Sequence, residues 1–227
     1  MNGWKRFYTW VILLCTLLSV CATPVSAKED RVRPKYHQVY DKVPNFYQTD
    51  YAHIRYGKGN MATSGCGITC LAMVASYLTD SFYDPGELGV FYYWKGNTPG
   101  ARMQRAAKDI GLSFRPKTKS FEEVVQALRD GHPVIYLLYG KSEFNTEFGH
   151  FLVLTGVTEE GRILVNDPYE PNYSDKNLME GYENGFKEEQ IRKGFIGAWI
   201  FESKRDRNAT DKVLIQKGCM QILLLPC

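Results

Sequence analysis

The clearest hydrophobic pattern in the chain lies between Ile68 and Leu78. Apolar residues recur there at positions 68, 71, 72, 75 and 78, which is the spacing of a helix with one buried face. Ser64 and Gly65 precede this pattern and no proline interrupts it, so we expect the helix to begin at Cys66. The pattern therefore predicts a cysteine at the N-terminus of an amphipathic helix.

The remaining patterns place helices first and strands later. Two helices are predicted at 87–95 and 102–110, and a third begins after Ser120, because Ser120 and Glu123 have the spacing of a capping box. Four apolar, branched runs then predict strands, at 134–139, 151–157, 162–166 and 198–201. Helices followed by antiparallel strands indicate an α+β domain rather than a doubly wound one.

The first 27 residues have the pattern of a signal peptide. Lys5 and Arg6 precede an apolar run of about fourteen residues, and Val25–Ala27 has the small residues of a cleavage site. The run is shorter than the roughly twenty residues that span a bilayer. We therefore expect a secreted or cell-surface protein without stable membrane insertion after cleavage. Lipid attachment at Cys21 is an alternative, since the preceding residues resemble an acylation motif.

The rest of the chain divides into a linker, a domain and a tail. With 227 residues and 44% apolar composition, the chain has enough hydrophobic residues for one core. Residues 28–42 are charged and unpatterned and predict a linker, 43–203 form the expected domain, and 204–227 form a tail of unknown role. The formal net charge of +3 falls to +1 without Lys5 and Arg6, so nothing indicates nucleic acid as a partner.

Four cysteines lie outside the predicted signal peptide: Cys66, Cys70, Cys219 and Cys227. They are too few and too unevenly spaced for a disulfide scaffold. Cys70 follows Cys66 by one helical turn, a position suited to packing. Pairing of Cys219 with Cys227 in an oxidising compartment stays open.

A cysteine at position 66 has a chemical advantage if the helix begins there. The free amides and the positive end of the helix dipole favour a thiolate, and the same amides can hold a developing oxyanion. Gly67, which has no β-carbon, would let a substrate backbone approach closely. The alternative is that Cys66 is a buried structural cysteine.

The strands predicted at 151–157 and 162–166 should form a hairpin, and a Tyr-, Gly- and Asn-rich loop follows them. A four-residue turn at 158–161 would pair Val157 with Arg162 and would place Asp167 opposite Leu152. Residues two apart on one strand share a face with the residues opposite them. The register therefore predicts that residues 150 and 167 point to the same side of the sheet.

His150 and Asp167 would then be diagonal neighbours. Their backbones would lie about 7 Å apart, a gap that the two side chains can close with a hydrogen bond. Asn166 would face the other side, and a bulge in the hairpin would reverse the choice. Taken alone, His150 is also explained as a hydrogen-bonded histidine at a strand end, and Asp167-Pro168 as a turn.

Together these residues supply what acyl transfer to a thiol requires. Cys66 would attack a carbonyl, His150 would take its proton and return it to the leaving amine, and Asp167 would hold the imidazole. Gln48 and the Cys66 N–H are the candidate oxyanion donors, although Gln48 is also explained as a surface glutamine. The other histidines, His37, His53 and His132, form no cluster with carboxylates, so we expect no metal and no cofactor.

The chain resembles the family thirty-nine-like cysteine peptidases, relatives of the bacteriocin-processing peptidase domain in the papain-like superfamily. The segments that carry the resemblance are Val43-Pro44 with Gln48, Ser64–Val74, Gly131–Ile135, Gly149–Leu154 and Asn166-Asp167-Pro168. The resemblance implies a papain-like α+β fold, a Cys66–His150–Asp167 triad, and Gln48 in the oxyanion hole.

Three functions follow from this sequence. The first is a secreted cysteine peptidase or peptide amidohydrolase that forms a thioester and acts on a peptide or protein substrate. The second is a non-catalytic module on the same fold that binds peptides or the cell wall. The third is an endopeptidase that cleaves cell-wall peptides. The sequence does not define an oligomeric state.

Overall fold

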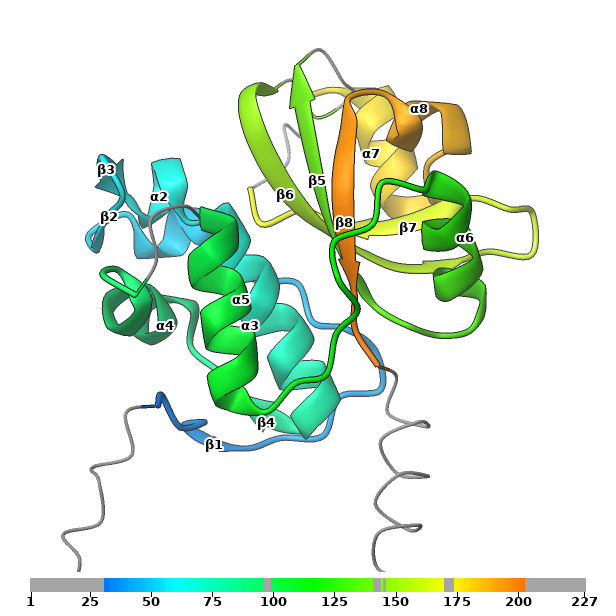
Figure 1. Ribbon diagram of the computed structural model, residues 1–227. Helices are drawn as coiled ribbons and strands as arrows, with labels where there is room; N and C mark the ends of the chain where they lie inside the picture. The colour runs from blue at the N-terminus through cyan, green and yellow to red at the C-terminus, as the bar shows by residue number, and fades with distance from the viewer. Residues whose placement is uncertain (1–30, 96–98, 141–143, 145, 170–173, 203–227) are drawn as a thin grey trace, which may run out of the picture. The chain divides into compact units, whose positions relative to one another are not determined.

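The computed structural model describes residues 31–95, 99–140, 144, 146–169 and 174–202 (Figure 1). From Val32 onward, the described elements belong to one compact unit. The predicted signal peptide and the tail lie outside the described residues, as do Cys21, Cys219 and Cys227. The expectations about export, lipid attachment and a disulfide between Cys219 and Cys227 therefore stay predictions.

Helices come first along the chain and the main sheet follows, as the sequence predicted. The helices are η1 (Gln48–Tyr51), α2 (Met61–Ser64), α3 (Cys66–Thr79), α4 (Pro85–Tyr92), α5 (Pro99–Ile110), α6 (Phe121–Arg129), α7 (Lys176–Asn184) and α8 (Glu188–Arg192). The strands are β1 (Tyr36–His37), β2 (Arg55–Tyr56), β3 (Gly59–Asn60), β4 (Ser81–Phe82), β5 (Val134–Gly140), β6 (Thr146–Val157), β7 (Ile163–Asn166) and β8 (Phe195–Ile200). Among the described residues, no helix is both long and apolar enough to cross a membrane.

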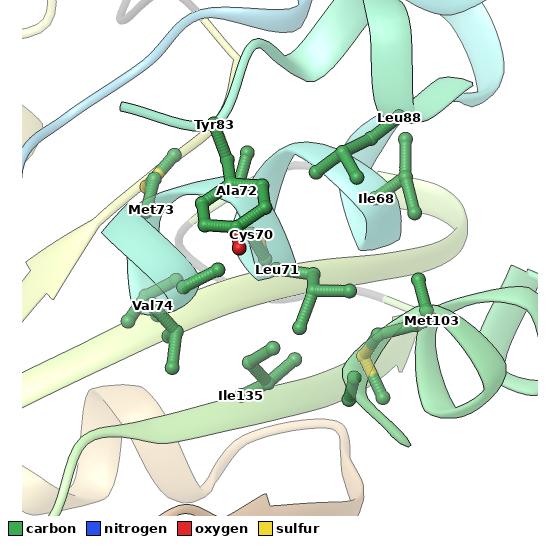
Figure 2. Close-up of a cluster of buried hydrophobic side chains, with 14 of the residues drawn as sticks. Ile68, Cys70, Leu71, Ala72, Met73, Val74, Tyr83, Leu88, Met103 and Ile135 are labelled. Carbon is green, nitrogen blue, oxygen red and sulfur yellow. The ribbon is translucent and has the colours of Figure 1, made fainter. Parts of the chain in front are cut away.

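Helix α3 begins at Cys66, as predicted, but it is not amphipathic. Every residue from Cys66 to Ser76 is buried, because α4, α5, β4 and β6 all pack against this helix. Figure 2 shows side chains of α3 in this core beside Met103 of α5 and Ile135 of β5. A helix that is buried all round lies in the core of a protein. The prediction that α3 has one buried face and one exposed face was therefore wrong.

Cys70 confirms the packing role that its spacing predicted. Its side chain is fully buried, and burial raises the pKa of its thiol well above the ordinary value. A buried thiol of this kind is inert as a nucleophile.

The main sheet is antiparallel and has the strand order β7-β6-β5-β8. Alternation along its strands divides the core into two clusters. On one side, Ile135, Phe151, Val153 and Trp199 pack in the same cluster as α3. On the other side, Tyr136, Leu152, Leu154 and Ile200 pack with residues of α6. This arrangement of helices and an antiparallel sheet confirms the expected α+β class.

The β6–β7 hairpin reaches the predicted register by a different route. Val157 pairs with Ile163 and not with Arg162, so the predicted four-residue turn was wrong. An irregularity between Leu154 and Gly156 then shifts the register by one residue, and Val153 pairs with Asn166. This is the predicted register at the end of the hairpin that carries the histidine and the aspartate. The bulge compensates for the longer turn.

The described part of the predicted linker packs against the domain. Strand β1 pairs with β4, and the ring of Tyr36 stacks on that of Phe82 with the centroids 5.0 Å apart. The ammonium of Lys35 lies 2.7 Å from a carboxylate oxygen of Asp84. The linker prediction therefore needs correction for this part. Its partners follow more than forty residues later, so no local pattern reveals them.

Candidate active site

The position of Cys66 is set by the junction between α2 and α3. Asn60 and Thr63 form a capping box that begins α2, and the Gly65 N–H closes that helix by donating to the Met61 carbonyl at 2.8 Å. Gly65 is then the N-cap of α3, without a side-chain cap. A β-carbon at Gly65 would lie 2.5 Å from the Met61 carbonyl oxygen. Only glycine fits this junction, which places the Cys66 thiol at the start of α3.

Gly67 lies where the start of α3 packs against β6. A β-carbon on this buried residue would point at the ring of Phe151, with the nearest ring atom 3.4 Å away. This is an ordinary contact distance, so the start of α3 packs on β6 beside Phe151, and the close approach of a substrate backbone at Gly67 stays a prediction. Because Phe151 follows His150 in β6, this packing brings the start of α3 to the strand that carries the histidine.

His150 is buried and has both a carboxylate and a thiol as neighbours. Its Nε2 lies 2.8 Å from Oδ1 of Asp167, which leaves Nδ1 for the Cys66 side chain. Burial alone lowers the pKa of His150. The charge and hydrogen bond of Asp167, with smaller contributions from Cys66, outweigh burial and raise the pKa of His150 to about 10. The imidazole therefore favours its protonated form at neutral pH.

Asp167 is a buried carboxylate with three hydrogen-bond donors. Oδ1 accepts from His150 Nε2 and from the Tyr169 N–H, each at 2.8 Å. Oδ2 accepts from the Tyr182 hydroxyl, also at 2.8 Å. The histidine and the aspartate thus point to the same side of the sheet, as the register predicted.

Tyr182 is the residue of this site that sequence reasoning missed. It lies on α7, in a segment that we interpreted as a Tyr-, Gly- and Asn-rich loop. Burial and the neighbouring charge of Asp167 raise the pKa of the Tyr182 phenol, so it stays a hydrogen-bond donor. The one sequence signal for α7 is Asp175, the N-cap residue of this helix. Its side chain accepts hydrogen bonds from the N–H groups of Asn177 and Leu178.

Gln48 is buried and is not a surface glutamine. Its backbone N–H donates to the carbonyl of Pro168, the residue after Asp167, at 2.7 Å. The side-chain Nε2 donates to the Ala62 carbonyl of α2. Among the described residues, Oε1 has no hydrogen-bond partner. A glutamine amide carries two N–H donors, so one donor remains for a ligand.

The segment before Gln48 is held on the hairpin by Asn166. The side-chain Nδ2 of Asn166 donates to the carbonyls of Val43 and Pro44, at 2.9 and 3.0 Å. Asn166 therefore uses its side chain to fix the chain that leads to Gln48. The next residue, Asp167, uses its side chain to hold His150.

The other histidines form no second site. His132 is buried and satisfied: its Nδ1 bonds to the Phe201 carbonyl at 3.1 Å, and its Nε2 accepts from Arg115 at 3.4 Å. His37 and His53 are exposed. In the part of the chain that the structure describes, no group of three or more His, Cys, Asp or Glu side chains is arranged to hold a metal ion.

Comparison with known proteins adds a family match. The model of the Peptidase_C39 like family matches residues 40–196. A solved structure of the peptidase domain of Streptococcus ComA, a bi-functional ABC transporter involved in a quorum-sensing pathway, aligns with a TM-score of 0.43 and 22% identity over 61% of this chain and 90% of that chain. No curated protein matches this chain. The family match spans the segments that carry Gln48, Cys66, His150 and Asp167.

Proposed function

This chain belongs to the Peptidase_C39 like family, and on that premise we propose that it is a secreted cysteine peptidase, or peptide amidohydrolase, that works through a thioester. The observation that carries the proposal is the position of His150. Its ring is bonded through Nε2 to Asp167, and its other nitrogen is available to the thiol at the start of α3. A buried histidine with these two neighbours has the arrangement that thiol acyl transfer requires.

In the proposed reaction, the Cys66 sulfur attacks the carbonyl carbon of a peptide bond. His150 takes the thiol proton on Nδ1, in keeping with the raised pKa of that imidazole. The tetrahedral intermediate collapses when His150 gives this proton to the leaving amine, and a thioester remains on Cys66. Water then attacks the thioester with His150 as the base, which releases the acid and restores the thiol.

In this proposal, two donors stabilise the oxyanion. One is the backbone N–H of Cys66, at the positive end of α3. The other is the second N–H of the Gln48 amide, because the first is used by the Ala62 carbonyl. The hydrogen bond from the Gln48 backbone to Pro168 links this donor to the turn that follows the catalytic carboxylate.

The decisive experiment compares the exported full chain with its Cys66→Ala variant. We expect wild type to hydrolyse an unfolded protein and to react with iodoacetamide at Cys66, as located by peptide mass spectrometry. Cys66→Ala should lose both properties while it keeps its circular dichroism spectrum. Cys70→Ala is the matched control, since Cys70 is fully buried and should not be labelled. Equal turnover by wild type and Cys66→Ala would contradict the proposal.

The same proteins separate the alternatives. Release of fragments from purified peptidoglycan, without cleavage of the unfolded protein, would favour the cell-wall endopeptidase. Tight binding of peptides by wild type without turnover would favour the non-catalytic module. Export is tested separately by N-terminal sequencing of the secreted protein, which we expect to begin near Lys28.

A further inference from the structure

We propose that Tyr182 is a positioning residue for the catalytic carboxylate, one that fixes the orientation of Asp167 and thereby the ring of His150. This inference rests on the proposed function of the same site. It concerns a residue that lies outside the segments linking this chain to cysteine peptidases by sequence resemblance.

The hydrogen bonds of Asp167 show why a further residue is needed. Oδ1 is shared between His150 and the Tyr169 N–H, and both bonds meet the same oxygen. The carboxylate turns about its Cβ–Cγ bond, and a donor to the second oxygen restrains this rotation more strongly than donors to Oδ1 alone. Within the described part of the chain, the Tyr182 hydroxyl is the one donor to Oδ2. Because Asp167 is only 6% exposed, water does not readily replace that donor.

The hydroxyl is itself held by the packing of α7. The ring of Tyr182 meets that of Phe186 edge to face, with the centroids 5.3 Å apart. A β-carbon on Gly181 would overlap the same ring, so this glycine lets α7 settle against Phe186. Arg162, at the start of β7, donates to the Gly185 carbonyl at 3.0 Å. The packing of α7 therefore fixes where the Tyr182 hydroxyl lies, and this hydroxyl in turn holds Oδ2 of Asp167.

The electrostatics agree with a role as a permanent donor. Burial, followed by the charge of Asp167, raises the pKa of Tyr182, so the phenol stays protonated at any working pH. Among the described residues, His150, Cys70 and Tyr182 interact electrostatically with Asp167. Cys66 interacts with His150, and Tyr47 interacts with Tyr182. Loss of the hydroxyl would let the carboxylate turn away from His150, and the imidazolium of His150 would then be less stabilised beside the thiol.

Tyr182→Phe removes the hydroxyl and keeps the ring. We expect kcat to fall by roughly tenfold to a hundredfold, the range for loss of a hydrogen bond to a charged group. KM should change less than about twofold, because the hydroxyl acts through Asp167 and not on the substrate. The acid limb of the pH–rate profile should move to higher pH.

Tyr136→Phe is the matched control. Its hydroxyl is also buried and donates to a backbone carbonyl, that of Ile191, at 2.7 Å. This variant loses a comparable hydrogen bond away from the candidate site. It should lose thermal stability and keep the wild-type pH profile. If Tyr182→Phe also kept that profile and its kcat, the hydroxyl would have only a structural role and the proposal would be overturned.

A second readout separates this proposal from the proposed function. The rate at which iodoacetamide alkylates Cys66 is measured against pH, without any substrate. We expect the acid limb of this curve to move to higher pH in Tyr182→Phe and to stay in place in Tyr136→Phe. If wild type showed no hydrolysis dependent on Cys66, the proposed function would fail, yet this curve would still decide the role of Tyr182. An unchanged curve overturns it.

Discussion

Nε2 of His150 lies 2.8 Å from Oδ1 of Asp167, across the hairpin formed by β6 and β7. The two residues are 17 positions apart in sequence and are brought together by the strand register. Because the carboxylate takes Nε2, the orientation of the ring leaves Nδ1 for the thiol. The assignment of this one bond therefore determines which atom of the histidine handles the proton.

Asp167→Asn should keep the shape of the site and lose its charge. Without the carboxylate, the main cause of the raised pKa of His150 disappears, and its imidazole should favour the neutral form at neutral pH. We expect kcat to fall by as much as about 10⁴-fold, the loss seen when the aspartate of a Ser-His-Asp triad becomes an asparagine. Steady-state kinetics against a peptide substrate measure the effect.

The control for this change is Asp175→Asn. Asp175 caps α7 through its side chain, and asparagine is an equally good N-cap. This variant should keep wild-type kinetics. Equal losses in both variants would show that the effect of Asp167→Asn comes from folding and not from the charge beside His150.

The stability of the fold should fall as the pH rises from about 6.5 to about 10. The folded-state pKa of His150 is raised from 6.5 to about 10, so the folded protein holds a proton that the unfolded chain releases in this window. The stabilisation is fully present below the unfolded pKa and is lost as the pH rises through the folded pKa. Its size is on the order of a few kcal/mol.

Urea unfolding between pH 6 and pH 10 measures this effect for wild type and for His150→Gln. The glutamine cannot be protonated, so the difference in the free energy of unfolding between the two proteins should shrink as the pH rises. Parallel stability curves would contradict the raised pKa of His150.

Gln48→Ala should separate transition-state stabilisation from thiol reactivity. The variant lacks the side-chain donor, and we expect kcat to fall by about 10- to 10³-fold. The rate of Cys66 alkylation should stay close to wild type, because His150 and Asp167 keep their hydrogen bond. Gln38→Ala, a change at an exposed glutamine, is the control. Equal losses of turnover and of alkylation would show that Gln48 supports the position of the thiol instead.

Local patterns predicted the elements whose causes lie within a few residues. Helix α6 begins after Ser120, whose hydroxyl accepts from the Glu123 N–H at 3.1 Å. The side chain of Glu123 accepts from the Thr118 hydroxyl, which in turn accepts from the Ser120 N–H. The spacing of Ser120 and Glu123 therefore predicted the helix start correctly. The Glu123 side chain does not accept from the Ser120 N–H directly, as in a capping box, but through the Thr118 hydroxyl. The start of α3 was predicted for the same reason, because a small residue directly precedes an uninterrupted apolar run.

The parts that the sequence did not predict depend on distant partners. The buried outer face of α3 follows from the packing of α4 and α5, which a helical period cannot reveal. The bulge near Thr155 compensates for a longer turn, and neither changes the alternation of apolar residues enough to be recognised. The role of Tyr182 depends on α7 reaching back to Asp167, so the side chain is recognisable only once the helix is in place.

Gly65→Ala should displace the nucleophile. A β-carbon at this position would lie 2.5 Å from the Met61 carbonyl oxygen and 2.9 Å from the end of the Met61 side chain. The side chain can move aside, but the carbonyl belongs to the backbone of α2, so the junction with α3 must open. We expect a loss of about 1–3 kcal/mol in the free energy of unfolding, as for other overpacked positions. Turnover should fall by more than the loss of folded protein accounts for, because Cys66 is the next residue and its thiol would be displaced.

Gly100→Ala is the control for this change. Gly100 lies in the first turn of α5, and a β-carbon there would meet its nearest neighbour, the ring of Trp199, at an ordinary 3.6 Å. Alanine should therefore be neutral or slightly stabilising. Thermal unfolding and Cys66 alkylation, measured on both variants and on wild type, distinguish the two effects. Wild-type alkylation in Gly65→Ala would mean that the junction tolerates a side chain, and that Gly65 is not what fixes the thiol at the start of α3.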